Sequence, residues 1–235
     1  MPKFDLIGFD ADDTLWQNER YYVAAQASFA QLLSRYHPEA WVRERLLQTE
    51  TRNLQHFGYG IKAFALSMIE TAVELTEGRI SGQDVRTLIE LGRGMLNAEV
   101  ELLEHVADTL PALAAGHRLA LITKGDLLDQ EKKVQRSGLA ACFKEVEIVS
   151  QKTPEVYARL LTRLGIQPQR FLMVGNSLRS DILPVLELGG SAVYIAHALT
   201  WEHEAAAAPA PGSPGYYSLD DFGQLPALLA ELEKG

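Results

Sequence analysis

Residues 4–14, Phe-Asp-Leu-Ile-Gly-Phe-Asp-Ala-Asp-Asp-Thr, join a short apolar run to a cluster of carboxylates. The run at 4–9 is typical of a strand buried on both faces of a parallel sheet. Asp10 and Asp12 come directly after it, so we expect their side chains at the carboxyl end of that strand. Open α/β sheets bind ligands at this edge. A solvated acidic turn that caps a helix would explain one or two of these acids.

A second polar motif follows another predicted strand. Residues 118–122 are mostly apolar and lead into Thr123, Lys124 and Gly125. A hydroxyl, a cation and a flexible backbone together suit an oxyanion such as phosphate. We therefore expect these three residues to bind an anionic group.

Two more motifs complete the series. Lys152 stands before a predicted helix in which Thr153 suits the N-cap, Pro154 the first position and Gly165 the stop. A last apolar strand, 171–174, leads into Gly-Asn-Ser-Leu-Arg-Ser-Asp at 175–181.

These four motifs together resemble the haloacid dehalogenase-like hydrolase superfamily, whose members share an Asp-x-Asp-x-Thr start, a Thr or Ser, a Lys and a late acidic motif. Each motif alone occurs by chance in many proteins. All four occur here in the required order and cover nearly the whole chain. The resemblance implies an α/β fold, with a Rossmann-like parallel sheet of strand order 5-4-1-2-3 that places all four motifs at one edge.

The residue types suit hydrolysis of a phosphate ester. That reaction needs a cation to neutralise charge, a positioned nucleophile and an acid for the leaving oxygen. Asp10 is the natural nucleophile, because a carboxylate can form an aspartyl-phosphate, and the family assigns the first Asp this role. Asp12 is expected to protonate the departing alkoxide and then to deprotonate the attacking water.

Hard oxygen ligands favour magnesium as the cation. The resemblance implies the same metal, bound by Asp10, the backbone carbonyl of Asp12 and the late motif with Asn176 and Asp181. Most phosphatases of this type carry Asp where this chain has Asn176. Either Asp181 binds the metal directly, or Asn176 does so while Asp181 acts through water, and we favour the second arrangement.

The expected phosphate site lies beside the metal. Lys152 would keep Asp10 ionised and touch the phosphoryl oxygens. Thr123 and the backbone amides that follow it, those of Lys124 and Gly125, would bind the same oxygens.

Residues 18–100 are expected to be helical, with helices at 21–36, 39–57, 61–75 and 84–96. Four helices inserted after the nucleophile loop resemble the family's helical cap of the first type, which excludes water and selects the leaving group. This predicts a catalytic core of residues 1–17 and 101–235 and a cap of residues 18–100. Arg52, Tyr59 and Lys62 either face the substrate or lie on a solvated helix face.

The remaining chain is expected to return to the sheet. The predicted elements are helices at 104–115, 126–136 and 225–232, a helix from about 180, strands at 145–149 and 192–195, and a surface loop at 205–214. Trp16 and Trp41 are expected to pack rather than to stack on a substrate.

Composition limits the partners and the location. A net charge of −9 over 235 residues argues against binding nucleic acid or an anionic membrane by bulk attraction. Cys142 is the only cysteine, which excludes an intrachain disulfide and favours a reducing cytoplasm. Neither a signal peptide nor a membrane-spanning run is expected. The expected partner is a small phosphorylated metabolite, bound by a monomer or homodimer.

The predicted function is therefore that of a magnesium-dependent phosphomonoester hydrolase. A true dehalogenase generally lacks the second catalytic Asp, so Asp12 favours a phosphatase. A phosphomutase stays open as an alternative. A catalytically silent module that binds a phosphorylated ligand is the alternative outside the enzymes, and intact Asp10, Asp12 and Lys152 argue against it. The motifs do not identify the substrate.

Overall fold

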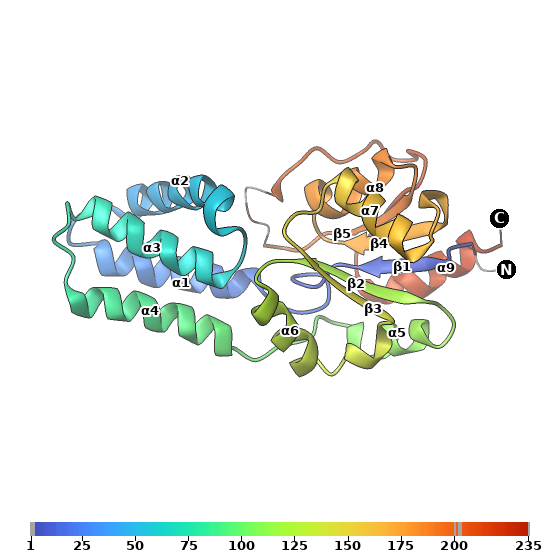
Figure 1. Cartoon of the computed structure of the whole chain (residues 1–235), viewed down its shortest axis with the longest axis horizontal. Helices are drawn as coiled ribbons and strands as arrows, with labels where there is room; N and C mark the ends of the chain where they lie inside the picture. Colours follow the sequence, from blue (N-terminus) through green and yellow to red (C-terminus); the bar gives the residue numbers. More distant parts are fainter. Residues whose placement is uncertain (1–2, 200, 202–203, 235) are drawn as a thin grey trace. The chain divides into compact units, whose positions relative to one another are not determined.

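The computed structural model describes residues 3–199, 201 and 204–234 of the chain. The chain divides into two compact units. The sheet unit contains Met1–Gln17, Val100–Lys124 and Gln130–Gly235, and the helical unit contains Asn18–Glu99 and Gly125–Asp129. Both units are drawn in Figure 1.

A parallel sheet organises the first unit. Within the described residues its strands are β1 (Leu6–Phe9), β2 (Leu119–Lys124), β3 (Glu145–Val149), β4 (Phe171–Gly175), β5 (Ser191–Ile195) and β6 (Tyr216–Leu219). Their order is β3-β2-β1-β4-β5-β6, and every pair is parallel. The predicted order 5-4-1-2-3 is contained in this sheet, which confirms the α/β fold class.

Strand β6 is an addition to the predicted sheet. It pairs with β5 at the edge, and three of its residues are half-buried and one exposed. A short strand at the edge of a sheet is only partly buried and does not need a continuous apolar run. Tyr216–Leu219 has no such run, so its sequence did not predict a strand.

Five helices accompany the sheet in the described chain. They are α5 (Val106–Ala114), α6 (Leu127–Arg136), α7 (Pro154–Leu164), α8 (Leu183–Glu187) and α9 (Leu225–Leu232). Helix α7 begins and ends as predicted, since the Thr153 side chain accepts a hydrogen bond from the Val156 amide and Gly165 takes a left-handed φ of 70°. The helix expected from about 180 differs, because a π-helical turn, Leu178–Ile182, precedes α8.

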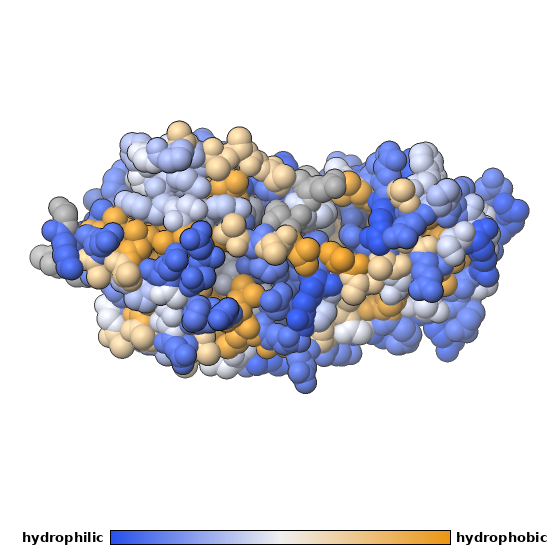
Figure 2. All heavy atoms as spheres, turned by 180° about the vertical axis from the view of Figure 1, so that it is seen from behind, coloured by the Kyte–Doolittle hydropathy of each residue, from blue (hydrophilic) through white to orange (hydrophobic). Residues whose placement is uncertain are grey.

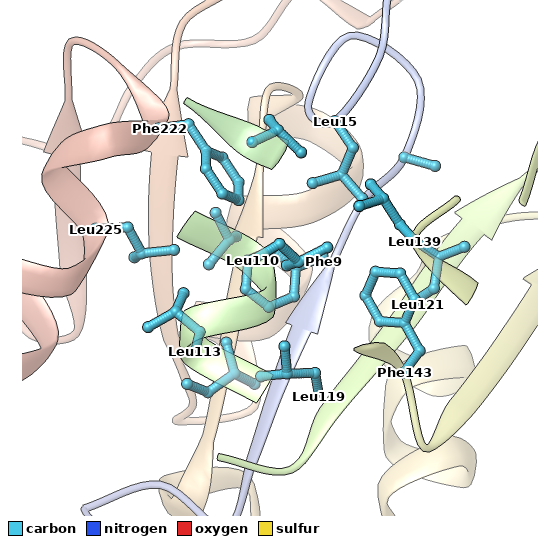
Figure 3. Close-up of a cluster of buried hydrophobic side chains, with 14 of the residues drawn as sticks. Phe9, Leu15, Leu110, Leu113, Leu119, Leu121, Leu139, Phe143, Phe222 and Leu225 are labelled. Atoms are coloured by element: carbon cyan, nitrogen blue, oxygen red, sulfur yellow. The ribbon is translucent and has the colours of Figure 1, made fainter. Parts of the chain in front are cut away.

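Alternate residues of the buried strands form two cores, one on each face of the sheet. Leu6 and Phe171 pack with α7 and α8 on one face. Phe9 and Leu121 pack with α5, α6 and α9 on the other, and Figure 3 shows this second cluster. A sheet covered on both faces keeps its strands fixed, so the loops at its carboxyl edge start from a rigid base.

The helical unit holds α1 (Glu19–Leu33), α2 (Glu39–Phe57), α3 (Ile61–Leu75) and α4 (Gly82–Asn97). The predicted bounds of the second and third helices agree with the structure, while α1 and α4 are displaced by up to three residues at their ends. Apolar side chains from all four helices form one core, including Phe29, Leu46, Met68 and Leu88.

The molecular surface mixes polar and apolar residues. Figure 2 shows groups of hydrophobic residues scattered among hydrophilic ones on one face. Of the helices in the described part of the chain, none combines the length and apolar character needed to cross a membrane.

Candidate active site

A tight turn presents the first motif at the carboxyl end of β1. The Asp10 amide donates to the Val174 carbonyl oxygen at 2.9 Å, which continues the pairing of β1 with β4. The Leu15 amide then donates back to the Ala11 carbonyl oxygen at 2.8 Å. Asp13 adopts a left-handed φ of 60°, which lets the chain reverse here. Asp10 is thereby buried at the sheet edge, with 6% of its surface exposed.

Lys152 joins the first and last motifs. Its Nζ lies 2.5 Å from Asp10 Oδ1 and 2.7 Å from Asp181 Oδ1. Burial works to lower the pKa of Lys152, but the two carboxylates raise it above its usual range, so the side chain stays an ammonium. Burial also raises the pKa of Asp181, against the opposing effect of Lys152. Three of the predicted site residues therefore form one buried ionic cluster.

Asn176 lies beside this cluster. The Thr14 hydroxyl is 3.2 Å from both Asp10 Oδ2 and Asn176 Oδ1. Since a hydroxyl carries one proton, it can donate to only one of these oxygens at a time. Asp10 Oδ2 and Asn176 Oδ1 therefore both lie next to the Thr14 hydroxyl.

Asp181 is held on both of its oxygens. Oδ1 accepts from Lys152, and Oδ2 accepts from the Ser177 amide at 3.0 Å. A Cβ on Gly175 would lie only 2.3 Å from Asp181 Oδ2, so the late motif needs glycine at this position.

The donor set of these residues fits a hard divalent cation. Carboxylate oxygens of Asp10 and Asp181 and the amide oxygen of Asn176 are the ligand types that magnesium prefers. Among residues 3–199, 201 and 204–234, no group of three or more His, Cys, Asp or Glu side chains is arranged to hold a metal. The expected set is of another kind, with two carboxylates, one amide and the backbone carbonyl of Asp12.

Asp12 lies at the same edge but in a different network. Trp16 Nε1 donates to its Oδ1 at 2.7 Å, and Gln130 Nε2 donates to its Oδ2 at 2.8 Å. Lys133 Nζ binds both oxygens, at 3.0 and 3.1 Å. The packing predicted for Trp16 is confirmed, since the side chain is buried, and the indole also serves Asp12. Sequence reasoning missed Gln130 and Lys133.

The second motif continues from β2. Thr123 is buried within that strand, and Gly125 follows it with a φ of 139°. Lys124 Nζ donates to Ser180 Oγ at 2.9 Å and also forms an ion pair with Glu204. The predicted anion-binding lysine is thus directed toward the late motif.

Glu204 is a further residue that sequence reasoning missed. Its Oε2 accepts hydrogen bonds from the hydroxyls of Ser177 and Ser180, each at 2.6 Å. Although burial works against ionisation, Lys124 and these hydroxyls lower the pKa of Glu204 to about 2. The residue comes from a non-periodic, Ala-rich stretch, so no local signal distinguishes it.

Comparison with known proteins assigns the family. The sequence profile described as haloacid dehalogenase-like hydrolase matches residues 4–189. The chain belongs to this family. It is therefore a hydrolase, and all four motifs lie within the matched region.

A solved structure supports this membership over the whole length. The haloacid dehalogenase-like family hydrolase from Xanthomonas campestris is 42% identical, covers 99% of this chain and 93% of its own, and superimposes with a TM-score of 0.89.

Curated relatives of this haloacid dehalogenase-like hydrolase include phosphatases. N-acylneuraminate-9-phosphatase of Rattus norvegicus is 28% identical over 174 residues, which are 70% of this chain and 66% of that enzyme. Glyceraldehyde 3-phosphate phosphatase of Methanothermobacter thermautotrophicus is 31% identical over 131 residues, which are 52% of this chain and 58% of that enzyme. The chain thus spans 66% and 58% of the lengths of these two relatives, less than two thirds of each.

In the helical unit of the hydrolase, Arg52 and Lys62, which were expected either to face the substrate or to lie on a solvated helix face, both form ion pairs. Arg52 forms ion pairs with Glu70 at 2.7 Å and Glu74 at 3.0 Å. Lys62 pairs with Asp126 at 2.8 Å. The predicted packing of Trp41 is wrong, because 46% of its surface is exposed on α2.

Proposed function

We propose that this hydrolase is a magnesium-dependent phosphomonoesterase that acts on a small phosphorylated metabolite through an aspartyl-phosphate on Asp10. The observation that carries the proposal is the contact of Lys152 with Asp10 at the sheet edge. An ammonium next to a carboxylate keeps the nucleophile ionised and attracts an anionic substrate. The names of the curated relatives, which are phosphatases, support the same reaction class.

The reaction follows from the residue types. A carboxylate oxygen of Asp10 forms a bond to phosphorus while the ester P–O bond breaks, and Asp12 gives a proton to the departing oxygen. Asp12 then takes a proton from water as the water oxygen attacks phosphorus. The bond from phosphorus to Asp10 breaks and inorganic phosphate leaves.

Magnesium, when bound, would supply positive charge to the phosphoryl oxygens. Asp10, the backbone carbonyl of Asp12 and Asn176 would hold it directly, with Asp181 acting through water. The engagement of both Asp181 oxygens by Lys152 and Ser177 supports the indirect role of Asp181.

Thr123, Lys124, Gly125 and Lys152 would bind the phosphoryl oxygens. Lys124 would share its ammonium between the substrate and Glu204, with which it is paired in the structure. A site that joins cations, hydroxyls and amides suits a phosphate dianion.

The remaining assignments follow from the family resemblance. Residues 1–17 and 101–235 would form the catalytic core and residues 18–100 a cap that selects the leaving group. The enzyme would work in the cytoplasm as a monomer or homodimer, without nucleic acid or membrane partners.

The test is phosphate release from p-nitrophenyl phosphate. We expect turnover with magnesium, loss with EDTA and recovery when magnesium is restored. Absence of phosphate release across a screen of phosphorylated metabolites would contradict the proposal. Halide release from a 2-haloacid would identify a dehalogenase instead, and ligand binding without turnover a binding module.

A further inference from the structure

The carboxylate of Asp12 is fixed from three directions. Trp16 and Lys133 bind Oδ1, while Gln130 and Lys133 bind Oδ2, at 2.7–3.1 Å. A carboxylate with one donor can still rotate about its side-chain bonds. With donors on both oxygens, the orientation of the carboxyl plane is set.

Helix α6 provides two of these donors. Gln130 and Lys133 are three residues apart and therefore share one face of the helix. They are 3% and 8% exposed, although both side chains are polar. Val134 of the same helix packs in the core beneath the sheet, which anchors the helix that carries them. Two of the three residues that donate to Asp12 thus lie on a helix anchored in the core.

These buried polar groups bind Asp12, and Gln130 Nε2 also donates to the Lys124 carbonyl oxygen at 3.3 Å. A buried ammonium is costly unless it is paired with an opposite charge. Gln130 Oε1 is buried and has no hydrogen-bond partner among the described residues, while its Nε2 reaches Asp12. Rotating the amide by half a turn would place Oε1 against the Asp12 carboxylate, where two oxygens repel. The contacts of Nε2 with Asp12 and with the Lys124 carbonyl oxygen therefore orient the amide, and Oε1 is left without a partner among the described residues.

We propose that Lys133 and Gln130 are positioning residues that fix the Asp12 side chain for proton transfer during phosphoester hydrolysis. The proposal rests on the phosphatase function argued above. Proton transfer requires the donor and acceptor atoms to lie within hydrogen-bond reach. Lys133 contacts both oxygens, so it can give up one contact while that oxygen carries the proton and keep the contact with the other oxygen. Loss of the support on both oxygens lets Asp12 turn away, and misplacement by about 1 Å costs about 100-fold in rate.

A structural measurement tests the positioning without relying on activity. The Trp16 indole N–H donates to Asp12, so the NMR signal of this indole N–H reports where that carboxylate lies. The chain has 3 tryptophans, and Trp16→Phe assigns the signal. We expect Lys133→Met to shift the Trp16 signal and Lys133→Arg to restore it in part. Lys132→Met is the matched control, because Lys132 is an exposed neighbour on α6, and it should leave the signal unchanged.

A kinetic measurement tests the consequence for catalysis. Phenolate is a more basic leaving group than p-nitrophenolate and depends more on protonation. In single-turnover release of the leaving group, Lys133→Met should slow phenyl phosphate by about 10- to 100-fold and p-nitrophenyl phosphate much less. KM for both should change little. Gln130→Met should show the same selectivity to a smaller degree, and serves if Lys133→Met fails to fold.

Three results would overturn the proposal: an unshifted Trp16 signal in the Lys133 and Gln130 variants, an equal loss for both substrates, or a loss confined to KM. Absence of phosphate release by the wild-type protein is a different result. It would contradict the proposed function, while the Trp16 signal would still decide whether Lys133 positions Asp12.

Discussion

Lys152 in the sheet unit and Glu50 in the helical unit are both buried ionisable side chains, but only Lys152 is paired with opposite charges. Lys152 lies between the carboxylates of Asp10 and Asp181. Glu50, on α2, is 9% exposed, and its Oε2 has no hydrogen-bond partner among the described residues. Burial raises the pKa of Glu50 to about 7. One unit gathers opposite charges where the chemistry is proposed, and the other leaves a buried acid to be neutralised by a proton.

The other charged side chains of the helical unit also differ from those at the sheet edge, because their ion pairs lie at the surface. In its ion pairs Arg35–Asp84 and Arg52–Glu70, the arginine side chains are 58% and 45% exposed. Exposed pairs contribute about 0–1 kcal/mol each. Apolar packing among α1–α4 therefore supplies most of the stability of this unit, whereas charge dominates the sheet edge.

The largest expected effect is that of Asp10→Asn. An amide is a poor nucleophile and has no charge to offer a cation, so kcat should fall by at least about 1000-fold. Phosphate release should be measured along with the melting temperature, which should show that the fold survives. Activity close to wild type would contradict the covalent mechanism.

Lys152→Met should have the next largest effect. Removing the cation leaves the carboxylates of Asp10 and Asp181 close together and buried, which should destabilise the protein by about 3–5 kcal/mol. Denaturant unfolding measures this, and turnover should be lost as well. Lys144→Met removes the same charge from an exposed position and should change the free energy of unfolding by less than about 0.5 kcal/mol. Equal changes in the free energy of unfolding for Lys152→Met and Lys144→Met would show that the buried ion pairs of Lys152 contribute no more to stability than an exposed lysine does.

The positions of Asp10 and Lys152 also show how much of the site could be predicted from the sequence. Asp10, Lys152 and Asp181 follow predicted strands, and the family resemblance implies a strand order in which these strands end at one edge. Their meeting could therefore be predicted from the motifs together with that resemblance. The strand at 145–149 and the caps of α7 could be predicted for local reasons, since apolar alternation and the Thr-Pro start need no distant partner.

The residues that were missed depend on contacts that local pattern does not encode. Lys133 reaches Asp12 across 121 positions of sequence, and Glu204 reaches Lys124 across 80. In sequence, a lysine on an amphipathic helix and a glutamate in an Ala-rich stretch are typical of solvated surface. Only the packing of α6, and of the segment after β5, brings these side chains to the sheet edge.

The late motif gives a third and smaller effect within the sheet unit. Asn176→Asp adds a charge beside the oxygens of Asp10 and should tighten the apparent affinity for magnesium several-fold, with turnover largely kept. Asp181→Ala should raise the magnesium requirement by about 10-fold, as loss of a supporting group does. Titrations of activity against magnesium measure both. Normal magnesium dependence and full turnover in Asp181→Ala would show that the late motif was assigned wrongly.

A further expected effect lies in the helical unit and depends on pH. Because the pKa of Glu50 is raised from 4.5 to about 7 on folding, the native state binds more protons than the unfolded state between these values. The contribution of Glu50 to stability is then greatest below pH 4.5 and falls as pH rises through about 7, by up to about 3 kcal/mol at 1.36 kcal/mol per pKa unit. Glu50→Gln stays neutral at every pH and escapes this loss.

The measurement is the free energy of unfolding of Glu50→Gln and wild type by denaturant at pH 4 and pH 8. Subtracting one protein from the other cancels the titration of all other groups. We expect the variant to gain about 2–3 kcal/mol over wild type between the two pH values. Glu44→Gln, an exposed position on the same helix, should show a difference that hardly changes with pH. A pH-independent difference for Glu50→Gln would mean that Glu50 finds a partner in solution, and the contrast with Lys152 would then be one of degree.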